Sequence, residues 1–193
     1  MKVLITGGAG FIGSTIASCC ADNGITPVIL DDYSTGLRAF AERFDHYEGD
    51  IADVALLHRI LDEHPDIEAV VHCAAKIVVP ESVSRPLYYY ENNVGKATTC
   101  VRTLSELGVK RVLLSSTAAM YIPGEDLMVT EQSTADPSSP YAASKWSWSE
   151  CLPTPPRPAS SAPSHCATST PSGRTRSCAP ACRTRPRPTR WAR

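Results

Sequence analysis

The stretch VLITGGAGFIG, residues 3–13, decides the fold of this 193-residue chain. Its first four residues are mostly apolar and predict a short buried strand, and residues 11–21 predict a helix that stops near Gly24. The turn between them fits two spacings, G-x-G-x-x-G and G-x-x-G-x-x-G, through Gly7, Gly8, Gly10 and Gly13. Glycine allows a tight turn, close approach of the backbone to a pyrophosphate, and close packing of helix on strand. The stretch therefore predicts a dinucleotide site at the start of a helix.

An acidic residue, Asp31, follows the second predicted strand, residues 27–30. A carboxylate in this position can accept hydrogen bonds from both ribose hydroxyls and repels a 2′-phosphate. The sequence thus favours NAD over NADP as the cofactor. A glycine turn in an unrelated α/β protein is the alternative interpretation.

Strand and helix patterns alternate through the first 150 residues. Apolar runs at 69–73 and 111–115 predict further strands, whereas residues 52–63 and most of 83–107 predict helices. Strands that are almost wholly apolar are typical of a parallel sheet covered on both faces. We predict an α/β fold, a Rossmann-type doubly wound parallel sheet over residues 1–150, truncated and followed by a disordered tail.

A second group of residues has the character of a catalytic site. Tyr141 and Lys145 are four residues apart after Pro140, so a helix would place both on one face. A nearby ammonium lowers the pKa of a tyrosine from about 10, and such a tyrosine can act as a general base. The run Ser115-Ser116-Thr117 closes a predicted strand and could relay a proton or hold a substrate oxygen. By itself, a Tyr–Lys pair at this spacing is more often a solvated helix face.

Residues 1–150 resemble the extended short-chain dehydrogenase/reductase superfamily and, within it, the UDP-glucose 4-epimerase family. The resemblance extends almost continuously through this part of the chain. Its segments are Thr6–Ser14, Asp31, Glu48–Ile51, His72–Lys76, Pro80–Val83, Tyr89–Val94, Ser115–Tyr121, and Pro140-Tyr141 with Lys145. The family commonly has Tyr-Gly where this chain has Tyr121-Ile122.

The resemblance implies a set of site residues. Asp50 and Ile51 would receive the adenine ring, and Lys76 and Asn92 would contact the nicotinamide half of NAD. The catalytic set would be Thr117, Tyr141 and Lys145. The full cofactor-binding set would be Gly7, Gly10, Phe11, Ile12, Gly13, Asp31, Asp50, Ile51, Lys76, Asn92, Tyr141 and Lys145.

The resemblance also implies an activity, the NAD-dependent epimerisation of a UDP-hexose (UDP-glucose or UDP-galactose) at C4 through a 4-keto sugar. The main alternative is a nucleotide-sugar 4,6-dehydratase, or another extended short-chain dehydrogenase. The related dehydratases carry Asp-Glu directly after the threonine, whereas this chain has Ala118-Ala119, which cannot exchange protons. A non-catalytic NAD-binding fragment is the other alternative. The family usually dimerises through two long helices, so a homodimer is possible for an intact form.

Composition excludes several other classes of protein. No apolar run is long enough for a membrane span or a signal peptide, so we expect a cytoplasmic protein with reduced cysteines. The spacing of His165, Cys166, Cys178 and Cys182 fits no common zinc pattern, so no metal is expected.

The tail, residues 151–193, differs sharply from the rest. All of its eight charged residues are arginines, it is rich in proline, and its only large apolar residues are Leu152 and Trp191. Such a segment cannot bury enough apolar surface to offset its loss of conformational entropy. We expect it to be disordered or an out-of-frame reading of an epimerase gene, with the substrate domain absent. It contains no recognisable nucleic-acid-binding module, so no nucleic-acid partner is expected.

Overall fold

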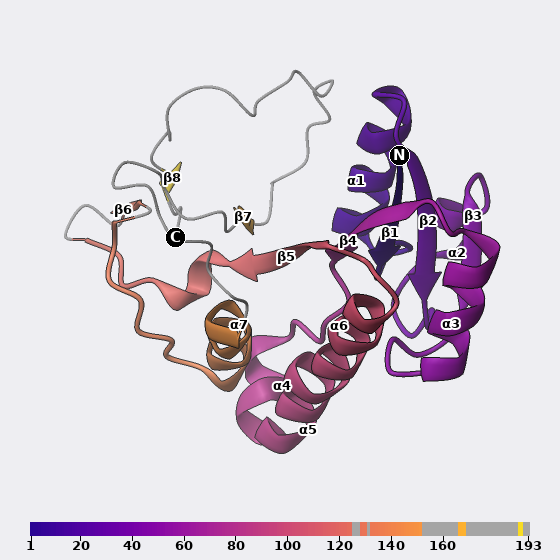
Figure 1. The fold of residues 1–193 in the computed structure, drawn as a ribbon. Coiled ribbons are helices and arrows are strands. Elements are labelled where there is room, and N and C mark those ends of the chain that lie inside the picture. The colour runs from indigo at the N-terminus through magenta and orange to yellow at the C-terminus, as the bar shows by residue number, and fades with distance from the viewer. Residues whose placement is uncertain (125–127, 131, 152–165, 169–188, 191–193) are drawn as a thin grey trace.

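The computed structural model describes residues 1–124, 128–130, 132–151, 166–168 and 189–190 (Figure 1). Within them, a six-stranded sheet has the order β3-β2-β1-β4-β5-β7, with every pair of neighbouring strands parallel. The strands are β1 (Lys2–Thr6), β2 (Thr26–Asp31), β3 (Asp45–Glu48), β4 (Ile67–His72), β5 (Arg111–Thr117) and β7 (Cys166–Thr168). This strand order confirms the predicted Rossmann-type fold. The order reverses between β1 and β4, where open α/β sheets form their ligand crevice.

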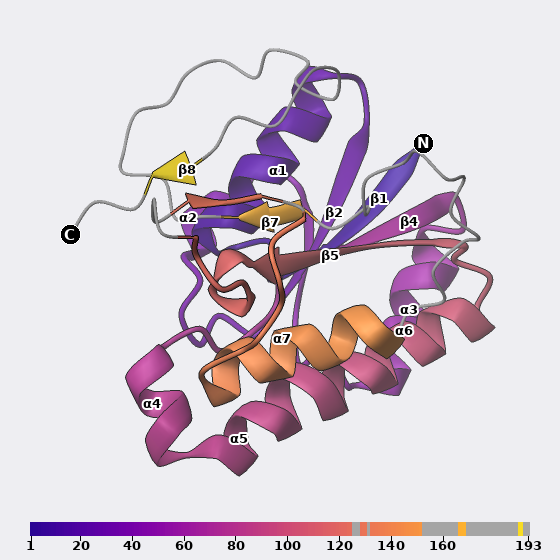
Figure 2. The ribbon, with the colours of Figure 1, turned by 90° about the vertical axis from the view of Figure 1, so that its left-hand side faces the viewer.

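Helices cover both faces of the sheet (Figure 2). One face carries α1 (Phe11–Asp22) and α2 (Arg38–Ala41). The other carries α3 (Val54–Glu63), α6 (Ala97–Glu106) and α7 (Pro140–Cys151). Three shorter elements lead into α6: α4 (Val79–Ser84), α5 (Pro86–Tyr90) and the π-helix η1 (Glu91–Lys96). They pack against α7, so the helix with the Tyr–Lys pair has neighbours along its length.

Alternation along the strands divides the core in two. In β1, Leu4 packs on the side of α3 and α6, whereas Val3 and Ile5 pack on the side of α1. In β2, Leu30 and Ile29 divide in the same way. Because successive side chains point to opposite faces, a strand covered on both sides must be apolar at every position. This explains why the apolar runs in the sequence predicted these strands correctly.

Several elements differ from the sequence prediction, and two of the differences have a clear physical reason. The helix expected over residues 83–107 is broken at Arg85, because Pro86 has no N–H to donate and disfavours a helical conformation in the residue before it. Strand β3 was not predicted, since its sequence DHYE is polar and three of its four residues are exposed at the edge of the sheet.

Little of residues 151–193 belongs to the described structure. Strand β7 pairs with β5, and β8 (Thr189–Arg190) pairs with β6 (Met128–Val129) in a separate two-stranded sheet. The predictions of disorder, an altered reading frame and an absent substrate domain otherwise fall outside the described residues. Among the described helices, none combines the length and the apolar character needed to cross a membrane.

Candidate active site

The glycine turn is shaped by close backbone packing. Gly7 has φ +69°, and a side chain there would meet the backbone nitrogen of Ala74 at 2.6 Å. A side chain at Gly13 would overlap the carbonyl oxygen of Gly7. Positive φ and direct backbone contact both require glycine. The turn consequently brings the first turn of α1 up against the ends of β1 and β4.

Gly10 has a different role from the other glycines of the turn. A Cβ atom there would meet only the Gly7 carbonyl oxygen, at 3.3 Å, so the space in front of Gly10 is open. Gly10 is also the N-cap of α1, and no side chain caps this helix. A helix N-terminus without a side-chain cap can donate N–H groups to a phosphate. The open space and the available donors fit the pyrophosphate of a dinucleotide. Phe11 is exposed and Ile12 half-buried in the same turn.

Asp31 lies at the carboxyl end of β2 and is 6% exposed. Its Oδ2 accepts a hydrogen bond from the Ala9 N–H at 2.9 Å, and its Oδ1 accepts one from the Tyr33 N–H at 2.8 Å. Each carboxylate oxygen has a second lone pair for a ligand hydroxyl. The carboxylate is therefore fixed beside the glycine turn in an orientation that suits a ribose.

Asp50 and Ile51 follow β3, one strand further from the glycine turn than Asp31. Asp50 accepts a hydrogen bond from the Ala52 N–H and forms an ion pair with Lys96 of η1. Ile51 is buried in the core beside α3. That these two residues receive adenine stays a prediction, and Lys96 is a neighbour that the sequence did not indicate.

On the β4 side of the turn, Lys76 and Asn93 are joined by two hydrogen bonds. The Lys76 N–H donates to Asn93 Oδ1 at 2.8 Å, and Asn93 Nδ2 donates to the Lys76 carbonyl at 2.9 Å. Asn93 Nδ2 also lies 3.2 Å from Ser144 Oγ on α7. Asn92, the residue selected from the sequence, instead donates to the Tyr88 carbonyl. The buried residue that links the segment after β4 to α7 is thus Asn93. A π-helical segment, often found at functional sites, was the structural signal for it.

Thr117 and Tyr141 meet at the carboxyl end of β5. Thr117 is 7% exposed, and its side chain lies close enough to Tyr141 to lower the pKa of that tyrosine. The Ser139 hydroxyl accepts a hydrogen bond from the Ala142 N–H in the first turn of α7. This contact fixes the start of α7, the helix that carries Tyr141.

Lys145 lies on the next turn of α7 and is 8% exposed. Its Nζ donates to the backbone carbonyl of Ser115 at 3.0 Å. Burial lowers the pKa of Lys145 to about 8, and the neighbouring Cys73 opposes this shift. Lys145 is therefore anchored to the strand that also carries Thr117.

The pKa of Tyr141 corrects the sequence analysis. A lowered pKa was predicted, but burial of the hydroxyl raises the Tyr141 pKa, and the neighbouring Thr117 hydroxyl only opposes this rise. Burial penalises the charged forms of both groups, the phenolate of Tyr141 and the ammonium of Lys145. The spacing of the pair was predicted correctly, but its electrostatics depended on how deeply α7 packs.

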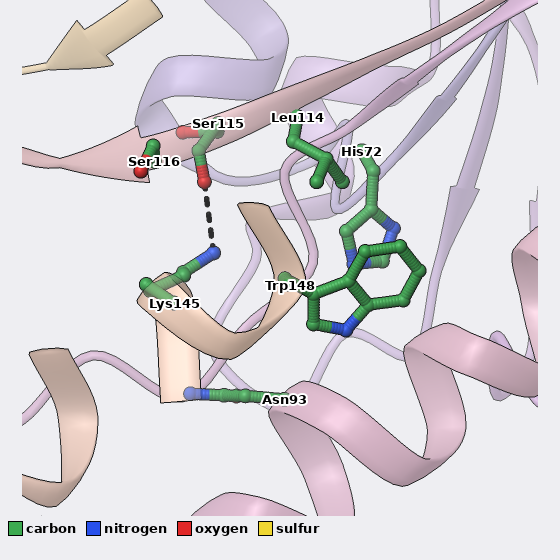
Figure 3. Close-up of a pocket in the computed structure, with 7 residues that line it drawn as sticks. All are labelled: His72, Asn93, Leu114, Ser115, Ser116, Lys145 and Trp148. Carbon is green, nitrogen blue, oxygen red and sulfur yellow. Dashed lines mark hydrogen bonds between the residues drawn. The ribbon is translucent and has the colours of Figure 1, made fainter. Parts of the chain in front are cut away.

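A cavity of about 10 Å³ lies beside Lys145, with room for about one water molecule (Figure 3). His72 and Trp148 stack along one side of it, with their ring centroids 6.1 Å apart. His72 Nδ1 is 2.7 Å from Thr6 Oγ1. Burial, with a smaller contribution from Lys145, lowers the His72 pKa to about 3. A neutral histidine thus supports the helix that carries Tyr141 and Lys145, and sequence analysis did not select it.

The glycine turn, Asp31 and the Tyr141–Lys145 pair lie at the carboxyl edge of the sheet, around the point where the strand order reverses. This arrangement is that of a Rossmann-type dinucleotide-binding protein with a short-chain dehydrogenase Tyr–Lys pair. The family model "NAD dependent epimerase/dehydratase family" matches residues 3–152. The chain belongs to that family.

Curated relatives agree with this family assignment. A UDP-glucose 4-epimerase of Azospirillum brasilense is 43% identical over 145 residues, which cover 75% of this chain and 41% of the relative. A UDP-glucose 4-epimerase of Streptococcus mutans is 38% identical over 149 residues, covering 75% of this chain and 44% of the relative. The chain thus spans less than half the length of these relatives.

Solved structures give the same result for the fold. The UDP-glucose 4-epimerase of Brucella ovis in complex with NAD superposes with a TM-score of 0.73 and 37% identity. The match covers 78% of this chain and 46% of that one. The enzyme of Bifidobacterium longum in complex with NAD+ and UDP gives a TM-score of 0.73 at 30% identity, over 78% and 47% of the two chains.

Proposed function

We propose that this chain is the cofactor-binding part of an NAD-dependent UDP-hexose 4-epimerase. The observation that carries the proposal is the hydrogen bond from Lys145 Nζ to the Ser115 carbonyl at 3.0 Å. It anchors α7, the helix of Tyr141 and Lys145, to β5, the strand that ends at Thr117. Relatives named UDP-glucose 4-epimerase support the choice of reaction and substrate.

Each residue has a defined task in this reaction. Tyr141 takes the proton from the sugar 4-hydroxyl in its phenolate form and later returns it. The Thr117 hydroxyl favours this form, whereas burial opposes it. Asp31 and the open space at Gly10 hold the ribose and the pyrophosphate. When bound, NAD supplies the acceptor that takes hydrogen from C4 and returns it to the other face of the 4-keto sugar. The protein thus contributes positioning and proton transfer.

Ala118 and Ala119 favour epimerisation over dehydration. They follow Thr117 directly and form a short 3₁₀ turn, η2 (Ala118–Met120), at the site. A 4,6-dehydratase must also remove a proton from C5 and expel water from C6, and a methyl group can do neither.

The first test is whether the 193-residue chain binds NAD, measured by isothermal titration calorimetry. The second begins with a DNA read from the Tyr141 codon to well past the Arg193 codon. The protein encoded by a restored frame is then incubated with UDP-galactose and NAD. We expect UDP-glucose by proton NMR, and its loss in Tyr141→Phe. A 4-keto-6-deoxy sugar as product would contradict the proposal in favour of a dehydratase, and we expect the 193-residue chain itself to show little turnover.

A further inference from the structure

Arg38, the first residue of α2, lies close to the acidic end of β2. Its guanidinium carbon is 4.3 Å from the centroid of the Tyr33 ring, and Nη2 forms an ion pair with Glu48 Oε2 at 2.5 Å. The side chains of Arg38 and Glu48 are each 56% exposed. Neither side chain is therefore part of the packed core, and either can be changed without opening it.

Glu48 is directly opposite Asp31 in the sheet, because the last residues of β2 and β3 are register partners. Tyr33, two residues after Asp31, is the one non-glycine residue of the described chain with positive φ, at 53°. The N–H of Tyr33 donates to Asp31, and its ring supports Arg38. Asp31, Tyr33, Arg38 and Glu48 thus form one cluster at the carboxyl ends of β2 and β3.

This cluster contains both elements that select between the two nicotinamide dinucleotides. In Rossmann folds an acid at the end of the second strand binds the ribose 2′-hydroxyl of NAD, whereas a nearby arginine accommodates the 2′-phosphate of NADP. Arg38 has the right chemistry for a phosphate, since a guanidinium can donate two parallel hydrogen bonds. Here Glu48 accepts from that guanidinium instead.

Given the proposed dinucleotide-binding function, we infer that Glu48 is a specificity-determining residue. By holding Arg38, it keeps a latent 2′-phosphate subsite closed and adds to the preference of Asp31 for NAD over NADP.

Glu48 offers a cleaner test than Asp31. Asp31 accepts backbone hydrogen bonds from Ala9 and Tyr33, so replacing it disturbs the glycine turn and the following loop. Replacing Glu48 by glutamine removes one charge from an exposed side chain and keeps its shape. Any change in cofactor preference can then be assigned to the Arg38–Glu48 pair.

The experiment measures the Kd of NAD and of NADP by isothermal titration calorimetry with the 193-residue chain. The variants are Glu48→Gln, Arg38→Met and the double variant. Glu106→Gln, at an exposed position of α6, is the control for net charge. We expect Glu48→Gln to bind NADP about 10-fold more tightly, and NAD within about twofold of the unmodified chain. In the double variant most of the gain should be lost, because no guanidinium remains.

Three results would overturn the inference: no gain for NADP in Glu48→Gln, a gain that persists without Arg38, or an equal gain in Glu106→Gln. These results are distinct from a failure of the proposed function. If the unmodified chain does not bind NAD, the proposed function fails and the inference fails with it. NAD binding with an unchanged NADP affinity in Glu48→Gln contradicts only the inference.

Discussion

At the glycine turn, the contacts that shape the site come mostly from three consecutive elements, β1, α1 and β2, with β4 close behind. The Tyr141–Lys145 end instead draws on β4, β5, η1 and α7, which are separated by long stretches of chain. The glycine end has a fixed carboxylate, Asp31, and open space at Gly10, as the proposed dinucleotide site requires. At the other end, burial favours the neutral forms of Tyr141 and His72 and lowers the pKa of Lys145. Backbone geometry thus determines the shape of a site built from local contacts, whereas burial determines the charge states in a site built from distant contacts.

The largest effect on stability should come from His72. Its pKa is about 3 in the folded protein and about 6.5 in the unfolded chain. The unfolded chain then binds the extra proton between these values, so stability falls as pH decreases from 6.5 towards 3. The loss attributable to this residue is roughly 4–5 kcal/mol. Urea unfolding followed by circular dichroism at several pH values measures it.

A matched pair of substitutions isolates the effect of His72. Thr6→Val with His72→Phe removes both partners of the buried hydrogen bond and keeps a ring against Trp148. This double variant should have a flatter stability profile between pH 3 and 6.5, whereas His58→Asn at an exposed position should not. An unchanged profile in the double variant would show that His72 does not control acid unfolding.

Gly13→Ala tests the local end of the site. The new methyl group would overlap the Gly7 carbonyl and lie 2.7 Å from Gly8 Cα, so backbone must move. We expect a loss of about 3 kcal/mol in the free energy of unfolding, measured by urea denaturation, together with loss of NAD binding.

Gly10→Ala is the matched control for that variant. Its methyl group has room within the protein but occupies the space assigned to the pyrophosphate. Stability should change by no more than about 1 kcal/mol, whereas NAD binding should weaken at least roughly tenfold. Equal effects of the two substitutions on stability would contradict the distinction between packing and ligand-facing glycines.

Lys145 should make the folded protein more stable as pH rises through the alkaline range, whereas His72 makes it less stable as pH falls. Its pKa is about 8 in the folded protein against about 10.5 when unfolded, so the folded state releases its proton first as pH rises. Stability conferred by this residue should therefore increase between pH 8 and 10.5, by roughly 3 kcal/mol. Between pH 7 and 10, the free energy of unfolding of the unmodified chain should rise by about that amount relative to the free energy of unfolding of Lys145→Met. A constant difference would contradict the burial of this ammonium.

The smallest effect should distinguish the two neighbouring asparagines. Asn93→Ala leaves the N–H and carbonyl of Lys76 without their side-chain partner and should cost about 2 kcal/mol. Asn92→Ala removes only a hydrogen bond to a carbonyl one helical turn back and should cost less than about 1 kcal/mol. Thermal and urea unfolding of both variants measure the difference. The reverse order would mean that Asn93 does not join the segment after β4 to α7.

The sequence by itself determined the sheet, the glycine turn, Asp31 and the spacing of Tyr141 and Lys145. These features follow from local rules: alternation along a strand, the glycine requirement of a tight turn, and the period of a helix. These rules did not predict strand β3, because its polar residues lie at an exposed edge of the sheet, where the sequence need not alternate between buried and exposed positions.

Only the tertiary structure decided that Asn93 rather than Asn92 is the buried link, that His72 meets Thr6, and that Glu48 holds Arg38 beside Asp31. It also reversed the expected direction of the Tyr141 pKa. These properties depend on which distant segments pack together and how much water they exclude. Spacing along the chain can place two groups on one helix face, but their charge states are set by the dielectric environment that the whole fold creates around them.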